Sequence, residues 1–145
     1  MTLHVSTIIV VEENRLLRCA IVANLRRQGY SVLEVISVTS ALEFIKQQSA
    51  HAVLLDMHPL AESADLLRQM RSLPILAQLP VVAMVAANSS LDALDYLDPG
   101  MWLRLPFDMQ FLDWLLKKLL AQQDGQEGRT PQTLQTPVQS EKEPH

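Results

Sequence analysis

Five short apolar runs, each ending at polar or turn-forming residues, mark the chain as far as Leu105. A short uninterrupted apolar run that is rich in branched side chains is typical of a strand buried on both faces. Between these runs the apolar residues recur at three- and four-residue spacing, which indicates helices that pack on the strands. We expect strands at Thr7–Val11, Ser31–Ser37, Ala52–Leu55, Val81–Ala86 and Met101–Leu105.

The first predicted helix follows Asn14, a favourable N-cap, and ends before Gly29, with Leu16, Leu17, Ala20, Ile21 and Leu25 turned toward the core. Further helices are expected from Thr39 or Ser40 through Ile45, at Ala61–Arg71, at Ser90–Leu97, and from Asp108 to about Gln122. Strands that alternate with helices imply right-handed crossovers and a parallel sheet with helices on both faces. The predicted fold class is therefore α/β, a doubly wound, flavodoxin-like (βα)5 sandwich with strand order 2-1-3-4-5.

Composition supports one domain, residues 1–122, followed by a tail, residues 123–145. The whole chain is 48% hydrophobic and 19% charged, a globular balance, but the tail is rich in Gln, Thr, Pro and charges, which predicts disorder. The net charge of −4 and the lack of a basic patch argue against nucleic-acid binding. Cys19 is the only cysteine, which excludes an intrachain disulfide and favours a cytoplasmic setting. No apolar run approaches the ~20 residues that cross a membrane.

Candidate chemistry gathers where the predicted strands end. Glu12 and Glu13 follow the first strand, and Asp56 follows the third. In open α/β sheets the working groups lie at the carboxyl ends of the strands. Three converging carboxylates would either bind a hard divalent cation or repel one another and raise a pKa. Alternatively, these ends are polar only because they meet solvent.

At this point the chain resembles the receiver domain of two-component response regulators, over about residues 5–120. The resemblance is carried by the segment from Ile8 to Arg18, by Leu54-Leu55-Asp56, by Leu66-Leu67-Arg68, by Gly100, and by Leu103-Arg104-Leu105-Pro106-Phe107-Asp108. It implies that Asp56 matches the aspartate that accepts phosphoryl from a histidine kinase. It also implies that Glu12 and Glu13 match the acidic pair that binds Mg²⁺ together with Asp56, and that the Leu105–Pro106 peptide bond is cis.

Two matched positions lack the chemistry of the family. Val85 falls where a Ser or Thr hydroxyl should grip the phosphoryl group, and Leu105 falls where a lysine should. Phosphoryl transfer depends on positioning and charge stabilisation, which neither side chain supplies. Arg104 is a poor substitute, because neighbouring strand residues point to opposite faces. We therefore expect a non-enzymatic pseudo-receiver that acts through protein–protein interaction. The alternative is a single-domain response regulator that takes phosphoryl on Asp56, and only then would Mg²⁺ be a cofactor.

The last predicted helix suggests where a partner would bind. Its core stripe is broad and aliphatic, while Phe111 lies at the edge and Trp114 on the opposite side with Lys117 and Lys118. A large aromatic residue outside the core stripe is typical of a contact surface. Resemblance to receivers places Trp102 at the switch position on the neighbouring strand. The expected partner is a protein, a histidine kinase or a second copy, bound through Trp102, Arg104, Phe111 and Trp114.

Overall fold

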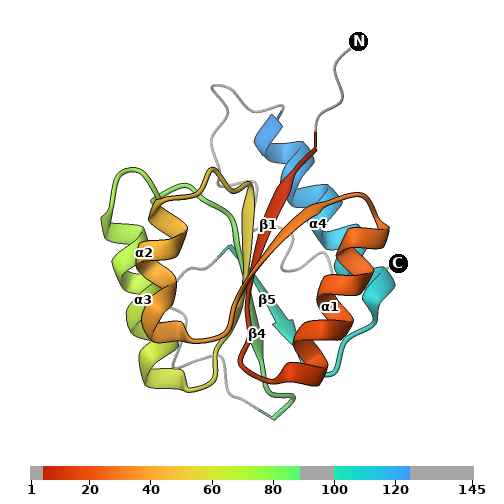
Figure 1. Cartoon of the computed structure of the whole chain (residues 1–145), viewed down its shortest axis with the longest axis horizontal. Helices are drawn as coiled ribbons and strands as arrows, with labels where there is room; N and C mark the ends of the chain where they lie inside the picture. Colours follow the sequence, from red (N-terminus) through yellow and green to blue (C-terminus); the bar gives the residue numbers. More distant parts are fainter. Residues whose placement is uncertain (1–4, 89–99, 125–145) are drawn as a thin grey trace.

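The computed structural model describes residues 5–88 and 100–124 (Figure 1). Its five strands form one sheet in the order β2-β1-β3-β4-β5, and all neighbouring strands run parallel. The predicted fold class and strand order are therefore confirmed. The strands are β1 (Thr7–Val11), β2 (Ser31–Val35), β3 (Ala52–Asp56), β4 (Val81–Val85) and β5 (Gly100–Arg104).

Helices cover both faces of the sheet, with α2 and α3 on one side and α1 and α4 on the other (Figure 1). The helices are α1 (Arg15–Arg27), a 3-10 turn η1 (Val38–Ser40), α2 (Ala41–Lys46), α3 (Leu60–Ser72) and α4 (Met109–Asp124). Asn14 caps α1 by accepting a hydrogen bond from the backbone N–H of Leu17 at 2.9 Å. Gly29, two residues beyond α1, has the left-handed φ of 98° that glycine adopts without strain. The helix expected at Ser90–Leu97 lies outside the described residues.

The core consists of two apolar layers separated by the sheet. Alternation along each strand divides its side chains between them, so that Val53 and Leu55 face α2 and α3 while Leu54 faces α1 and α4. All three side chains are fully buried. Burial on both faces is the reason that the strand sequences read as continuous apolar runs.

Two predicted core residues of the first helix, Leu16 and Ala20, are wrong. Leu16 is 82% exposed, whereas Ile21 and Leu25 are fully buried. Five residues separate Leu16 from Ile21, which places them about 140° apart around the helix at 3.6 residues per turn. Ala20 is also exposed. The buried face of α1 is therefore narrower than the sequence pattern predicted.

The Leu105–Pro106 peptide bond is cis, as the resemblance predicted. The His58–Pro59 bond is also cis, which the sequence analysis did not anticipate. In residues 5–88 and 100–124, no helix combines the length and apolar character needed to cross a bilayer.

Candidate functional site

Strand pairing brings Glu12 and Asp56 together at the carboxyl edge of the sheet. Val11 of β1 is in register with Leu55 of β3, so Glu12, which follows β1, lies beside Asp56, the last residue of β3. Both acids are buried, Glu12 to 1% exposure and Asp56 to 9%. The sequence prediction that acids from separate strands converge at this edge is met by this pair.

Each of the two carboxylates accepts one backbone hydrogen bond from its own loop. Glu12 Oε2 accepts from the N–H of Asn14 at 3.0 Å, and Asp56 Oδ1 accepts from the N–H of His58 at 3.1 Å. The second oxygen of Glu12, Oε1, is buried and has no hydrogen-bond partner as an ionised group. Two ionised carboxylates are both acceptors, so they can hydrogen-bond to each other only when a proton lies between them.

The pKa of Glu12 is raised from 4.5 to about 8, and burial is the largest cause. The hydrogen bond with Asp56 and the negative charges of Asp56 and Glu13 contribute to this rise, while the hydrogen bond from the Asn14 N–H opposes it. At neutral pH Glu12 is therefore mainly a neutral acid that donates a hydrogen bond to Asp56. The neighbouring acids contribute to this shift, but burial is its largest cause.

Glu13 does not complete a compact set of three acids. Glu13 is exposed, and it affects the pKa of Glu12 only through its negative charge. Within the described ranges 5–88 and 100–124, no three His, Cys, Asp or Glu side chains stand close enough to hold a metal ion. The arrangement thus does not fit the three-carboxylate Mg²⁺ site of Glu12, Glu13 and Asp56 that the resemblance implies.

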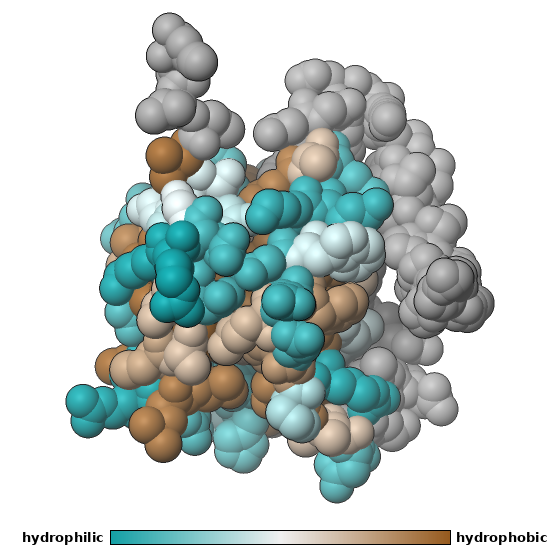
Figure 2. Space-filling model, turned by 90° about the vertical axis from the view of Figure 1, so that its right-hand side faces the viewer, coloured by the Kyte–Doolittle hydropathy of each residue, from teal (hydrophilic) through white to brown (hydrophobic). Residues whose placement is uncertain are grey.

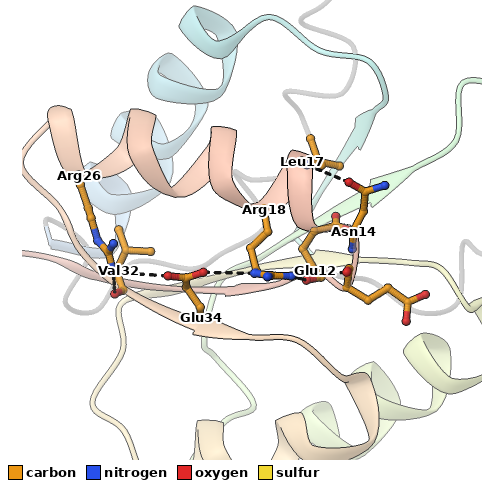
Figure 3. A network of polar contacts seen from close by, with 8 residues as sticks. Glu12, Asn14, Leu17, Arg18, Arg26, Val32 and Glu34 are labelled. Carbon is orange, nitrogen blue, oxygen red and sulfur yellow. Dashed lines mark hydrogen bonds and ion pairs between the residues drawn. The ribbon is translucent and has the colours of Figure 1, made fainter.

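An arginine missed by the sequence analysis fixes the loop that carries the acids (Figure 3). Arg18 Nη1 donates to the backbone oxygens of Glu12 at 2.9 Å and Glu13 at 3.4 Å, and its Nε pairs with Glu34 Oε1 at 3.2 Å. Arg26 Nη2 approaches the other oxygen of Glu34 at 3.7 Å. The available signal was weak, because Glu34 lies on an edge strand and is exposed, where a charge needs no partner.

A buried serine ties the loop after Asp56 to α3. Ser63 has no exposed surface, and its Oγ donates to the backbone oxygen of Asp56 at 2.9 Å. The N–H of Met57 donates to the oxygen of Met84 at 2.9 Å. Asp56 is thus held in place through its side chain, its carbonyl and the following residue.

The two positions expected to lack phosphoryl-binding groups lie beside this edge and are apolar. Val85 is 3% exposed and packs in the layer of α2 and α3. Leu105 packs against the layer of α1 and α4, and its N–H donates to the oxygen of Val85 at 2.7 Å. Their side chains contribute neither a cation nor a hydroxyl to the edge.

The expected contact residues fall on two sides of the molecule. Trp102 packs in the layer of α2 and α3, and Arg104 Nη1 donates to the oxygen of Ala87 at 3.0 Å. Phe111 and Trp114 lie on α4, across the sheet, and are 46% and 52% exposed. Their exposure agrees with the helical phase predicted from the sequence.

A family model for the response regulator receiver domain matches residues 8–119. The chain belongs to this family, whose members are generally non-enzymatic signalling modules. Its function is accordingly that of a receiver domain in response-regulator signalling. No curated protein matches the chain in sequence.

Solved structures similar to the chain are receiver domains. A response regulator from Thermotoga maritima is 21% identical with a TM-score of 0.71, over 81% of this chain and 99% of that one. A CheY-like receiver domain protein from Methanospirillum hungatei JF-1 is 18% identical with a TM-score of 0.75, over 86% and 100%. The receiver domain of sensor histidine kinase PA1611 from Pseudomonas aeruginosa PAO1 is 26% identical with a TM-score of 0.71, over 81% and 99%, and has a magnesium ion in its active-site cleft.

Proposed function

We propose that this chain is a pseudo-receiver, a signalling module that acts by binding another protein without accepting a phosphoryl group. The observation that carries the proposal is the apolar character of Val85 and Leu105, which lie at the carboxyl ends of β4 and β5, on the same edge of the sheet as Asp56. A phosphoryl group on Asp56 would add charge at a buried edge where these two positions offer no compensating donor or cation.

The state of Glu12 supports the same conclusion. Glu12 is a neutral acid, and its proton lies in a hydrogen bond with Asp56. Backbone and side-chain contacts from His58 and Ser63 already fix the loop around Asp56. Asp56 therefore has a structural role in one defined conformation, and a phosphoryl group is not needed to order this loop.

The alternative function is a single-domain response regulator that takes phosphoryl on Asp56 from a histidine kinase with Mg²⁺. The position of Asp56 at the end of the central strand, beside Glu12, is the observation that favours it. Its partner would be the kinase, whereas the pseudo-receiver binds a protein through its surface.

Intact mass spectrometry after incubation with acetyl phosphate and Mg²⁺ separates the two functions. We expect no phosphoryl adduct on the wild-type chain, because the edge cannot stabilise the transferring group. The double variant Val85→Thr and Leu105→Lys supplies the hydroxyl and the cation, and an adduct on this variant would show that these two positions are limiting. Asp56→Asn in the same background is the control and should lose the adduct. A stoichiometric adduct on the wild type would support the alternative.

A further inference from the structure

One buried oxygen atom of the acid pair at the carboxyl edge has no donor. Glu12 Oε2 accepts a hydrogen bond from the Asn14 N–H, and Asp56 Oδ1 accepts one from the His58 N–H. Glu12 Oε1 is buried and receives no hydrogen bond from the described residues. A buried carboxylate oxygen in this position needs a cation, a water molecule or a proton of its own.

A divalent cation does not fit the groups that surround Glu12 Oε1. Mg²⁺ takes about six oxygen ligands at roughly 2.0–2.1 Å and usually keeps several of its water molecules. Glu12 and Asp56 are both buried, so there is little solvent beside them to supply those waters. Glu13 is exposed, and the Ser63 hydroxyl is engaged with the carbonyl of Asp56. The pair therefore lacks the open, oxygen-lined space that a hydrated ion requires.

The residues next to the acid pair add apolar groups instead of oxygen ligands. Val85 ends β4 and Leu105 follows β5, and both side chains pack in the apolar layers. Leu16 and Leu60 each follow one of the acids by four residues and are exposed. Figure 2 looks onto the side of α1 and shows hydrophobic areas among hydrophilic ones at its lower end, where α1 begins. A hard cation gains no ligand from such side chains.

A shared proton satisfies the pair better than a water molecule does. With water between them, Glu12 and Asp56 would both stay ionised, and two like charges at a buried edge destabilise the fold. A proton removes one of these charges and gives Oε1 a hydrogen bond. The two carboxyl groups are in hydrogen-bond contact with each other, which requires that one of them is protonated.

We propose that a proton shared by Glu12 and Asp56 takes the place of the divalent cation that the family resemblance implies, with Glu12 Oε1 as donor and Asp56 as acceptor. The proton connects the loop after β1 to the loop after β3, as a cation bound to both acids would. The edge thus keeps one conformation with or without divalent cations. The proposal rests on the proposed function, because it explains why a module that accepts no phosphoryl group needs no metal.

Carbon NMR of the carboxyl groups detects the proton directly. In the full-length chain labelled with ¹³C at the glutamate carboxyl carbons, the Glu12 signal at pH 7 should have the chemical shift of a neutral acid. It should keep this shift when millimolar Mg²⁺ is added. Glu12→Gln assigns the signal by removing it. Glu62→Gln is the matched control, because Glu62 is exposed on α3 and its loss should leave the Glu12 signal in place.

Mn²⁺ tests the cation separately, because it is paramagnetic and binds the same oxygen ligands as Mg²⁺. The amide signals of Asn14 and His58 report on the pair, since these N–H groups donate to the two acids. We expect Mn²⁺ to broaden both signals equally in the wild type and in Asp56→Asn. Asp65→Asn, which changes an exposed acid on α3, is the control for cations that collect at the surface.

Three results would overturn the proposal. They are a Glu12 signal with the shift of a carboxylate in the metal-free chain, a move to that shift when Mg²⁺ is added, and broadening of Asn14 and His58 that Asp56→Asn abolishes while Asp65→Asn does not. None of them tests the pseudo-receiver function itself. Cation binding without a phosphoryl adduct would leave that function standing, whereas an adduct on wild-type Asp56 would contradict it whatever the state of Glu12.

Discussion

Glu12 is the residue whose chemistry departs furthest from that of a free side chain. Its carboxyl is buried, shares a hydrogen bond with Asp56 and has a pKa of about 8 instead of 4.5. The folded state therefore binds a proton that the unfolded state releases at lower pH. The resulting stabilisation is complete below pH 4.5, decreases as pH rises from there to about 8, and is absent above that value.

Glu12→Gln should remove this pH dependence. Glutamine is neutral at every pH and keeps an N–H donor for Asp56, so its variant should be more stable than the wild type at pH 9 and similar to it at pH 5. The wild-type free energy of unfolding should fall with a slope of up to about 1.4 kcal/mol per pH unit across this window. Urea denaturation at several pH values measures both slopes. Glu62→Gln is the control, because Glu62 is exposed on α3 and its charge is not among the causes of the Glu12 shift. Parallel curves for wild type and Glu12→Gln would show that Glu12 titrates normally.

At the residue scale, sequence reasoning located the acids but not their states. Alternation and the run before Asp56 placed it at the end of a buried strand, and the register of β1 with β3 then placed Glu12 beside it. The separation of Glu12 from Glu13 could not be predicted in this way. Glu12 enters the interior and Glu13 remains in solvent because of the path of the loop, whose two carbonyl groups accept hydrogen bonds from Arg18 in the first turn of α1.

At the level of elements, the strands were predicted more accurately than the helices. A strand buried on both faces has an unbroken apolar run, so β1 was found with its observed bounds, Thr7–Val11. Only one face of a helix packs against the sheet, and apolar residues next to that face can still be exposed to solvent. Leu16 illustrates this, because it lies on the first turn of α1 and is mostly exposed. The periodicity of apolar residues predicts where a helix forms, but tertiary packing determines how wide its buried face is.

The junction of β1, α1 and β2 depends on one side chain, Arg18. Only 12% of this side chain is exposed, and it holds two backbone oxygens and Glu34 together (Figure 3). Arg18→Met keeps most of the side-chain volume but leaves these acceptors without their charged donor. We expect a loss of about 1 kcal/mol in the free energy of unfolding, the usual net contribution of a hydrogen bond, because Glu34 and the carbonyl of Glu13 can still be hydrated.

The control for this prediction is Arg27→Met on the same helix, where the residue is exposed and the expected change is within about 0.5 kcal/mol. A double-mutant cycle with Glu34→Gln isolates the contribution of the pair itself. If Arg18→Met is as stable as Arg27→Met, the loop is held by its own backbone hydrogen bonds and the arginine contributes nothing measurable.

At the scale of the whole molecule, the folded unit is expected to be independent of the last part of the chain. Every buried apolar side chain among the described residues lies between Ile8 and Leu119, and α4 continues to Asp124, two residues into the segment expected to be a tail. The composition of residues 123–145 offers few apolar side chains with which to add to this core. We propose that these residues do not contribute to the stability of the domain.

A chain that ends at Asp124 should therefore melt within about 2 °C of the full-length chain. In a domain of roughly 120 residues this corresponds to a change of about 0.5 kcal/mol or less in the free energy of unfolding. A chain that ends at Lys118 is the matched control. It removes Leu119, which is only 5% exposed, together with the last turns of α4, and it should lose several degrees because deleting a buried leucine costs about 2–5 kcal/mol. Differential scanning calorimetry of the three chains at one pH gives the comparison. A clear drop in melting temperature for the chain ending at Asp124 would mean that residues 125–145 pack on the domain, and the boundary drawn from composition would then be wrong.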